Sequence, residues 1–478
     1  MNNFLFSFLL CLLLSSIQLG AQKDELPYKT ISLQNFNDFK SVTDNWKLIG
    51  DVFFATDEGG AITKPGTGIL INKPAKDAKG HLFTNLEHGD IELELDFMMA
   101  KNSNSGIYLQ GRYELQLFDS WGEHNPKFSD CGGIYQRLDK GHNIGYQGHP
   151  PLVNVSKAPG LWQHFRIVFH APRFNEKGQK TTNARFVRVY QNGVLVQNDV
   201  EVTGPTVSAA FQDEKGFGPL MFQGDHGAVA FRDIRYKKGQ GIPYHDLNAP
   251  LPVGAITVPV ESRSVVLRSF VNHSGHKVTA AVSVGGPEKL NYALDLSNGN
   301  LLKIWRGDFV ETTSMWHSRG LDQLAVPLGS VIEFSGRKPT IAFQIHKDGS
   351  WPDSNASYEY QGYDIDRAGR PVFRYAIGRA RVEESFIEAE GGKRLYRSFT
   401  IMLPNQETAE IWCRPAEGSD ITRLPNGLYA INDKQFYIEL PDKQKPVIRR
   451  TTADNISELL FHVKTTSNVA VVKYSIVW

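Results

Sequence analysis

One stretch, from Asn102 to Asp119, constrains the fold most, because its side chains alternate in character at a period of two. The odd positions are apolar or aromatic: Ile107, Leu109, Tyr113, Leu115 and Leu117. The even positions between Tyr108 and Phe118 carry amide, guanidinium and carboxylate groups: Gln110, Arg112, Glu114 and Gln116. Successive side chains of a strand point to opposite faces, so the pattern predicts strands with one face in a core and one polar face. Gly111 interrupts the run and indicates a bulge or a tight hairpin.

The polar face of this stretch has two interpretations. Most strands with such an alternation simply expose a solvated face. A sugar-binding face alternates in the same way, but it combines planar hydrogen-bonding groups for hydroxyls with an aromatic ring for the apolar side of the sugar. Glutamine, arginine and glutamate beside tyrosine and phenylalanine match that composition better than they match an ordinary solvated strand. The stretch therefore favours a carbohydrate site.

The rest of the chain predicts a mainly β protein with more than one domain. It contains 43 Gly and 24 Pro and few uninterrupted helical patterns, and Asn192-Gly193 is a typical hairpin turn. Many short strands separated by turns indicate two-sheet sandwiches. The length of 478 residues predicts two or three domains. We place a first domain at 24–240, a linker at 241–254 and a second β-rich, sandwich-like domain at 255–478, whose role the sequence leaves open.

The first 21 residues predict a secretory signal peptide. An apolar run at 4–14 is followed by small residues up to Ala21, which is the pattern of a cleavage site. The run is too short to span a bilayer, and no later stretch approaches that length. We therefore expect cleavage before Gln22 and a soluble protein in the periplasm or secreted from the cell.

Charge and cysteine content exclude several function classes. The formal net charge of +1 gives no electrostatic reason to expect nucleic acid or an anionic membrane surface as a partner. After the signal peptide only Cys131 and Cys413 remain, in different predicted domains. Two such distant cysteines form neither a disulfide framework nor a zinc site.

A series of motifs along the first domain occurs in a recognisable order. They lie at 104–109, 113–119, 131–135, 159–164, 171–174, 192–196, 218–223, 225–227 and 231–234. Together they resemble the 3-keto-disaccharide hydrolase family, long known only as a domain of unknown function. The resemblance covers about residues 30–238 and does not extend to the second domain. It implies a concanavalin-like jelly-roll with a concave substrate sheet, and substrates that are glycosides already oxidised to a ketone at C3.

A ketone at C3 changes how a glycoside can be cleaved. An ordinary glycosidase needs two carboxylates roughly 5–10 Å apart across the scissile bond. The ketone instead acidifies the C2 hydrogen, so one base can remove it, the enolate expels the aglycone from C1, and water then adds to the enone. Such a site needs a base, a stabiliser for the enolate oxygen and an acid near the leaving oxygen. An upstream sugar 3-dehydrogenase is the expected source of the ketone.

The candidate catalytic residues are His226, Glu114 and Arg112. An imidazole suits proton abstraction near neutral pH, and His226 lies between Asp225 and Gly227 in one of the motifs, so it is the leading candidate for the base. The alternative is that His226 only shapes a turn. Glu114 is the alternative base or the acid, and Arg112 is the expected stabiliser. The residues expected to bind substrate are Asn104, Gln110, Gln116, Asp119, Tyr135 and Gln223.

Some of these predictions have alternatives of a different kind. Asp119 is as well suited to capping a turn as to chemistry. No spacing of His, Asp or Glu demands a metal, and we expect no cofactor, although a divalent ion at the enolate is compatible with the chemistry. The acidic residues Glu92, Glu94 and Asp96 share one face of a predicted strand, which we interpret as a solvated surface, with Asp96 as a secondary candidate for the site.

Two other functions fit a sandwich with a sugar-binding face: a non-catalytic carbohydrate-binding protein and a conventional glycoside hydrolase. The joint presence of Glu114, Arg112 and His226 favours catalysis, because a purely binding face needs no titratable base. We therefore predict an enzyme that acts on 3-keto-glycosides.

Overall fold

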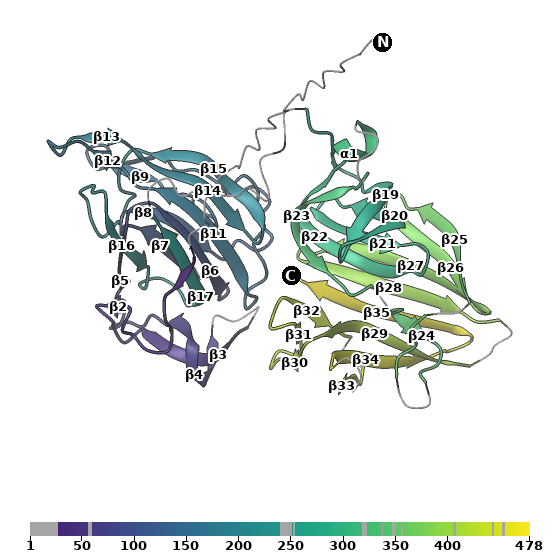
Figure 1. Ribbon diagram of the computed structural model, residues 1–478. Coiled ribbons are helices and arrows are strands. Elements are labelled where there is room, and N and C mark those ends of the chain that lie inside the picture. Colours follow the sequence, from purple (N-terminus) through teal and green to yellow (C-terminus); the bar gives the residue numbers. More distant parts are fainter. Residues whose placement is uncertain are drawn as a thin grey trace, which may run out of the picture.

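The computed structural model describes 27–55, 60–239, 251, 254–317, 323–336, 338–346, 350–354, 357–404, 408–441, 444–451 and 455–478. The predicted signal peptide and nearly all of the predicted linker lie outside these residues. Figure 1 shows an all-β protein in two parts, β1–β17 and β18–β35. The only helix in the described ranges is the single turn α1 (Thr313–Trp316). The predicted all-β fold class is therefore confirmed.

The first part is a sandwich of two antiparallel sheets. The eight-stranded sheet has the order β15-β14-β11-β6-β17-β4-β3, with β1 added to β17. Its strands are β1 (Lys29–Thr30), β3 (Trp46–Phe54), β4 (Ala61–Asn72), β6 (Ile91–Met99), β11 (Gln163–His170), β14 (Ala184–Gln191), β15 (Val194–Val202) and β17 (Val229–Lys238). The five-stranded sheet has the order β2-β5-β16-β7-β8 and comprises β2 (Phe39–Lys40), β5 (Leu82–His88), β7 (Asn104–Leu109), β8 (Tyr113–Phe118) and β16 (Gly218–Phe222). Two small hairpins join β9 (Arg137–Asp139) to β10 (Ile144–Tyr146) and β12 (Arg173–Phe174) to β13 (Lys180–Thr182).

The core of this sandwich lies between the two sheets. Leu93, Leu95 and Phe97 enter it from β6 in the eight-stranded sheet. The odd-numbered apolar residues of the opening stretch enter it from the five-stranded sheet: Ile107, Leu109, Tyr113, Leu115 and Leu117. All of them are almost fully buried, as the period of two predicted. Their even-numbered neighbours consequently point to the outer face of the five-stranded sheet.

The acidic face of β6 differs from the expectation. Glu92 and Glu94 are buried rather than solvated, because basic side chains of the neighbouring strands cover them. Arg166 of β11 donates to Glu92 at 2.7 Å, and Arg235 of β17 donates to Glu94 at 2.6 Å. Asp96 lies on this same outer face and pairs with His164 and Arg232. It therefore points away from the five-stranded sheet, which makes its secondary role in the predicted site wrong.

The second part contains three further sheets. The six-stranded sheet comprises β18 (Thr257–Val258), β19 (Val265–His273), β20 (His276–Gly285), β21 (Leu290–Asp295), β22 (Asn300–Glu311) and β23 (Val326–Glu333). The four-stranded sheet comprises β24 (Ile341–Ala342), β29 (Glu410–Gly418), β33 (Val447–Arg450) and β34 (Ser457–Lys464). The eight-stranded sheet comprises β25 (Tyr358–Ile365), β26 (Pro371–Ile377), β27 (Ala380–Ala389), β28 (Arg394–Met402), β30 (Ile421–Arg423), β31 (Tyr429–Ile431), β32 (Phe436–Glu439) and β35 (Val469–Val477). One apolar core joins residues of all three sheets.

The two parts pack directly against each other. Ala158 and Leu161, which precede β11, belong to the apolar core of the second part. The Tyr437 hydroxyl donates to the carbonyl of Pro159 at 3.2 Å. These contacts bind a loop of the first sandwich to the second part.

Candidate active site

The first row of the candidate site crosses the outer face of the five-stranded sheet. In the β7–β8 hairpin, Tyr108 lies directly opposite Glu114. Met221 of β16 pairs with Tyr108 on the other side, and Phe83 of β5 pairs with Met221. Residues paired in this way share one face of a sheet. The register therefore places two apolar side chains, a phenol and a carboxyl side by side.

A second row lies one step along the same strands. The backbone N–H of Gln223 donates to the carbonyl of Gly106 at 2.9 Å, and Gly106 lies opposite Gln116. The Gln116 side chain donates to Asn104 Oδ1 at 2.8 Å. The structure thus brings together three of the predicted substrate-binding residues, beside Glu114. Gln223 also has a buried side-chain oxygen with no hydrogen-bond partner among the described residues.

Gly106 makes room for the Glu114 carboxyl. A Cβ atom at this position would lie 2.3 Å from Glu114 Oε1. Any side chain would consequently displace the carboxyl, whereas glycine allows it to lie against the backbone. The absence of a side chain here helps to fix the position of the acid.

Glu114 is a buried carboxyl with no cationic partner. Glu114 is 3% exposed. In the described part of the chain no lysine or arginine forms an ion pair with it, and the neighbouring Arg112 pairs with Asp213. Burial raises the pKa of Glu114 to about 8; a hydrogen bond from the Tyr108 hydroxyl opposes this shift, and the negative charge of Asp225 adds to it. A carboxyl with a pKa near neutrality can exchange protons with a substrate at physiological pH.

His226 lies at the edge of this face, in the loop between β16 and β17. Its Nδ1 atom is 2.6 Å from Asp225 Oδ1, and its side chain is half exposed. With Lys101 and Ser103 it lines an open hollow of about 560 Å³. Asp225 thus contacts His226 and is also close enough to Glu114 to act on its pKa. Asp225 is therefore a charged neighbour of both groups, whereas the hollow that His226 lines contains neither Glu114 nor Tyr108.

Tyr135 lies on the other side of Glu114. Its backbone N–H donates to the Glu114 carbonyl at 3.1 Å, and its half-buried ring packs edge-on against Phe128. Burial and then the negative charge of Glu114 raise the pKa of Tyr135. This predicted substrate-binding residue is accordingly at the site.

Three predicted site residues make structural contacts instead. Arg112 points to Asp213, with Nη2 2.7 Å from Oδ1 and Nε 2.5 Å from the backbone oxygen. Gln110, at the hairpin turn, donates to the carbonyls of His88 and Gly216. Asp119 accepts hydrogen bonds from the backbone N–H groups of Asn102 and Trp121, so the capping alternative describes its contacts.

The sequence interpretation counted Tyr108 toward the composition of the polar face but did not name it as a site residue, and it gave Asp225 no role of its own. A signal for Tyr108 was present: a hairpin centred on Gly111 pairs residue 109 with 113 and residue 108 with 114. In the sequence, Asp225 stands out only as a neighbour of His226. Its effect on Glu114 depends on how near the loop between β16 and β17 lies to strand β8, which no local pattern encodes.

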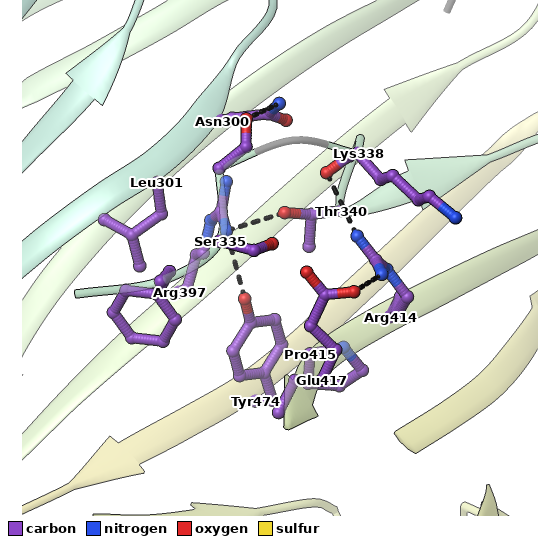
Figure 2. A pocket seen from close by; sticks show the side chains of 13 residues that line it. Asn300, Leu301, Ser335, Lys338, Thr340, Arg397, Arg414, Pro415, Glu417 and Tyr474 are labelled. Atoms are coloured by element: carbon purple, nitrogen blue, oxygen red, sulfur yellow. Dashed lines mark hydrogen bonds and ion pairs between the residues drawn. The ribbon is translucent and has the colours of Figure 1, made fainter. Parts of the chain in front are cut away.

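A polar cavity in the second part is a different kind of feature (Figure 2). Its volume of about 40 Å³ admits a few water molecules but no sugar ring. Arg397 pairs with Glu384, and Arg414 pairs with Glu417 and Glu458. Since the buried charges are compensated, we interpret this cavity as part of the structural core.

No metal site is visible in the described ranges, where no group of three or more His, Cys, Asp and Glu side chains is arranged to hold an ion. Cys131 and Cys413 are both free and buried. No described helix is long and apolar enough to cross a membrane.

A β-sandwich that presents a buried carboxyl among amide and phenol groups has the composition expected of a carbohydrate-active enzyme. Residues 32–237 match the family model of the 3-keto-alpha-glucoside-1,2-lyase-like domain, so the chain carries a domain of this family. The match confirms the resemblance and supports an enzyme that acts on glycosides. The residues beyond 237 are not assigned to a family.

Solved structures and curated proteins add little to this assignment. Two crystal structures of proteins from Parabacteroides distasonis, each described as a putative glycosyl hydrolase, are similar to the chain. The first is 25% identical over 44% of this chain and 84% of its own, with a TM-score of 0.30. The second is 21% identical over 45% of this chain and 100% of its own, with a TM-score of 0.29. No curated protein matches the chain.

Proposed function

We propose that the first domain cleaves 3-keto-glycosides by elimination followed by hydration, with net hydrolysis. The observation that carries this proposal is the Glu114 carboxyl, which is buried without a cation, accepts a hydrogen bond from Tyr108 and lies beside the side chains of the second row. The family match supports 3-keto-glycosides as the class of substrate. A carbohydrate-binding protein without catalysis gains nothing from a carboxyl whose pKa lies near neutrality.

The two titratable groups divide the proton transfers between them. His226 is the base, because Asp225 holds Nδ1 and leaves Nε2 available to the C2 proton of the substrate. Glu114, with a pKa of about 8, is mostly protonated at pH 7 and is the acid that protonates the leaving oxygen. Two titratable groups at one site commonly divide the acid and base roles in this way.

The electrons and atoms balance over two steps. In the first, the C2–H bond breaks, an enone forms through the enolate, and the C1–O bond breaks with transfer of a proton to the aglycone oxygen. In the second, water adds its oxygen to C1 and a proton returns to C2. Asn104, Gln116, Gln223 and Tyr135 supply the hydrogen bonds that orient the sugar hydroxyls and the ketone oxygen.

The test uses a disaccharide oxidised enzymatically at C3, with the native disaccharide as control, in deuterated water. We expect monosaccharide release only from the oxidised substrate, and deuterium at C2 of the product. Product without deuterium at C2, under conditions in which the free 3-keto sugar does not exchange, contradicts elimination. Equal cleavage of the native disaccharide indicates a conventional glycoside hydrolase, and binding without release indicates a carbohydrate-binding protein.

The location and the metabolic setting belong to the same proposal. The apolar run at 4–14 supports export to the periplasm or the medium, where the mature chain begins near Gln22. The substrate requires a sugar 3-dehydrogenase that acts first. Intact-mass measurement of the exported protein tests the cleavage site, and a retained Met1 contradicts it.

A further inference from the structure

Residues 203–217, here called the covering segment, cross the outer face of the five-stranded sheet above the first row of the site. The Thr206 N–H donates to the carbonyl of Arg112 at 2.9 Å, and the Ala210 N–H donates to the carbonyl of Gly111 at 3.1 Å. Ala209 packs against Tyr108 and Met221, both of which are almost fully buried. The covering segment therefore buries Tyr108 and Met221, the part of the first row that adjoins Glu114.

Arg112 attaches this segment to the sheet. Its guanidinium donates to the side chain and to the backbone oxygen of Asp213, and it lies 4.8 Å from the centre of the Phe211 ring. The Arg112 side chain is 4% exposed, whereas that of Asp213 is 52% exposed. Tyr113 adds a second attachment, because its hydroxyl donates to Glu214 at 2.7 Å.

Arg112 does not act on Glu114 through its charge. The titratable and charged groups around the Glu114 carboxyl are Tyr108 on β7, Tyr135 after β8 and Asp225 after β16. Asp225 bears a negative charge, the two phenols can only develop one, and none of the three is a cation. Burial is the largest cause of the raised pKa of Glu114, and Ala209 of the covering segment packs on Tyr108, the hydrogen-bond partner of Glu114.

We infer that Arg112 is a positioning residue: it holds the covering segment over the site and so keeps the Glu114 carboxyl out of water. The inference rests on the proposed role of Glu114 as the acid. It replaces the expectation that the Arg112 guanidinium stabilises the enolate. It also assigns a role to Asp213, which lies outside the motifs of the family resemblance.

The direction in which the pKa of Glu114 changes in an Arg112 variant separates the positioning role of Arg112 from a role as a nearby cation. If Arg112 acts through the covering segment, Arg112→Met admits water to Glu114 and lowers its pKa from about 8 toward 4.5. If Arg112 acts as a nearby cation, its removal raises that pKa instead. The alkaline limb of the pH–rate profile should move in the same direction as the pKa.

The experiment measures Glu114 directly, by carbon-13 NMR titration of labelled glutamate in the full chain, with Glu114→Gln to assign the signal. We expect Arg112→Met and Asp213→Asn each to lower the pKa by about one unit or more. Arg112→Lys should restore part of the shift. The matched control is Lys215→Met, which removes the second, exposed partner of Asp213 and should leave the pKa unchanged.

Three outcomes are decisive. An unchanged or raised pKa in folded Arg112→Met and Asp213→Asn overturns the positioning role. A lowered pKa with no effect of Glu114→Gln on turnover leaves the positioning role standing and refutes the proposed acid. Should Arg112→Met fail to fold, Asp213→Asn decides alone, because Asp213 is half exposed and its replacement keeps the side-chain shape.

Discussion

The two sheets of the first sandwich each bury a carboxyl group on their outer face, but cations compensate the carboxyl group on one sheet and not the one on the other. On the eight-stranded sheet, Glu92 is 1% exposed, accepts hydrogen bonds from Arg166 and Tyr28, and lies 3.8 Å from Lys237. On the five-stranded sheet, Glu114 is 3% exposed, and within the described ranges its one partner is the Tyr108 phenol. The two carboxyl groups are buried to a similar degree, and they differ in whether cations compensate their negative charge.

The comparison shows which carboxyl group is structural and which is functional. Burying an ionised carboxylate is costly unless cations and hydrogen bonds compensate it, and Glu92 has both. A carboxyl without compensation instead shifts its pKa and becomes protonated, as Glu114 does. A protein retains such a group at the expense of stability where its chemistry is useful.

The largest expected effect is on turnover by Glu114→Gln. Loss of the acid should lower the rate with sugar or alkyl aglycones by about 10²–10⁴-fold. The loss should be small with a nitrophenyl 3-keto-glycoside, because nitrophenolate leaves without protonation. Steady-state kinetics on both substrates measures the difference. An equal loss on both substrates would instead assign Glu114 to the transfer of the C2 proton. The control variant is Glu92→Gln, which should leave turnover per folded molecule unchanged.

The next largest effect is on stability, and it concerns Glu92 on the outer face of the eight-stranded sheet. Glu92→Gln should lower the free energy of unfolding by about 3 kcal/mol, because it removes the buried carboxylate that compensates the charges of Arg166 and Lys237. Glu114→Gln should leave stability unchanged or increase it. Urea denaturation at pH 7 of the two variants compares them directly. Equal destabilisation of both variants would show that compensation does not distinguish the two faces.

The pH dependence of stability sharpens the same contrast. The pKa of Glu114 is raised from 4.5 to about 8 in the folded protein, so between these values the folded state binds more protons than the unfolded state. Stability should then fall as the pH rises from about 4.5 to 8. The measurement is the difference in unfolding free energy between the natural protein and Glu114→Gln at several pH values. A difference that does not vary over this range contradicts the shift.

The smallest effect is expected where a carboxylate is paired but exposed. Glu201 pairs with Arg185 at 2.8 Å, and its side chain is 44% exposed. Glu201→Gln should change the unfolding free energy by less than about 1 kcal/mol, because water replaces the lost partner and Asp199 still pairs with Arg185. Urea denaturation beside Glu92→Gln provides the scale. A cost as large as that of Glu92→Gln would mean that pairing rather than burial sets the effect.

Much of the fold and part of the site follow from local patterns. The alternation between Ile107 and Phe118 determined which residues enter the core and placed Glu114 and Gln116 on one face. The ordered motifs determined the family of the first domain. Such features are readable because side-chain direction along a strand is a local property of the backbone.

The tertiary structure alone decided which partner each of these side chains meets. It covered Glu92 with Arg166 and turned Arg112 toward Asp213, a residue about a hundred positions away. Among the residues that the structure describes, it brought no cation to Glu114. Alternation specifies the face of a sheet but not the distant segment that packs on that face. Burial and charge compensation depend on those distant segments, so the chemistry of a carboxyl is set by the folded chain and not by its neighbours in sequence.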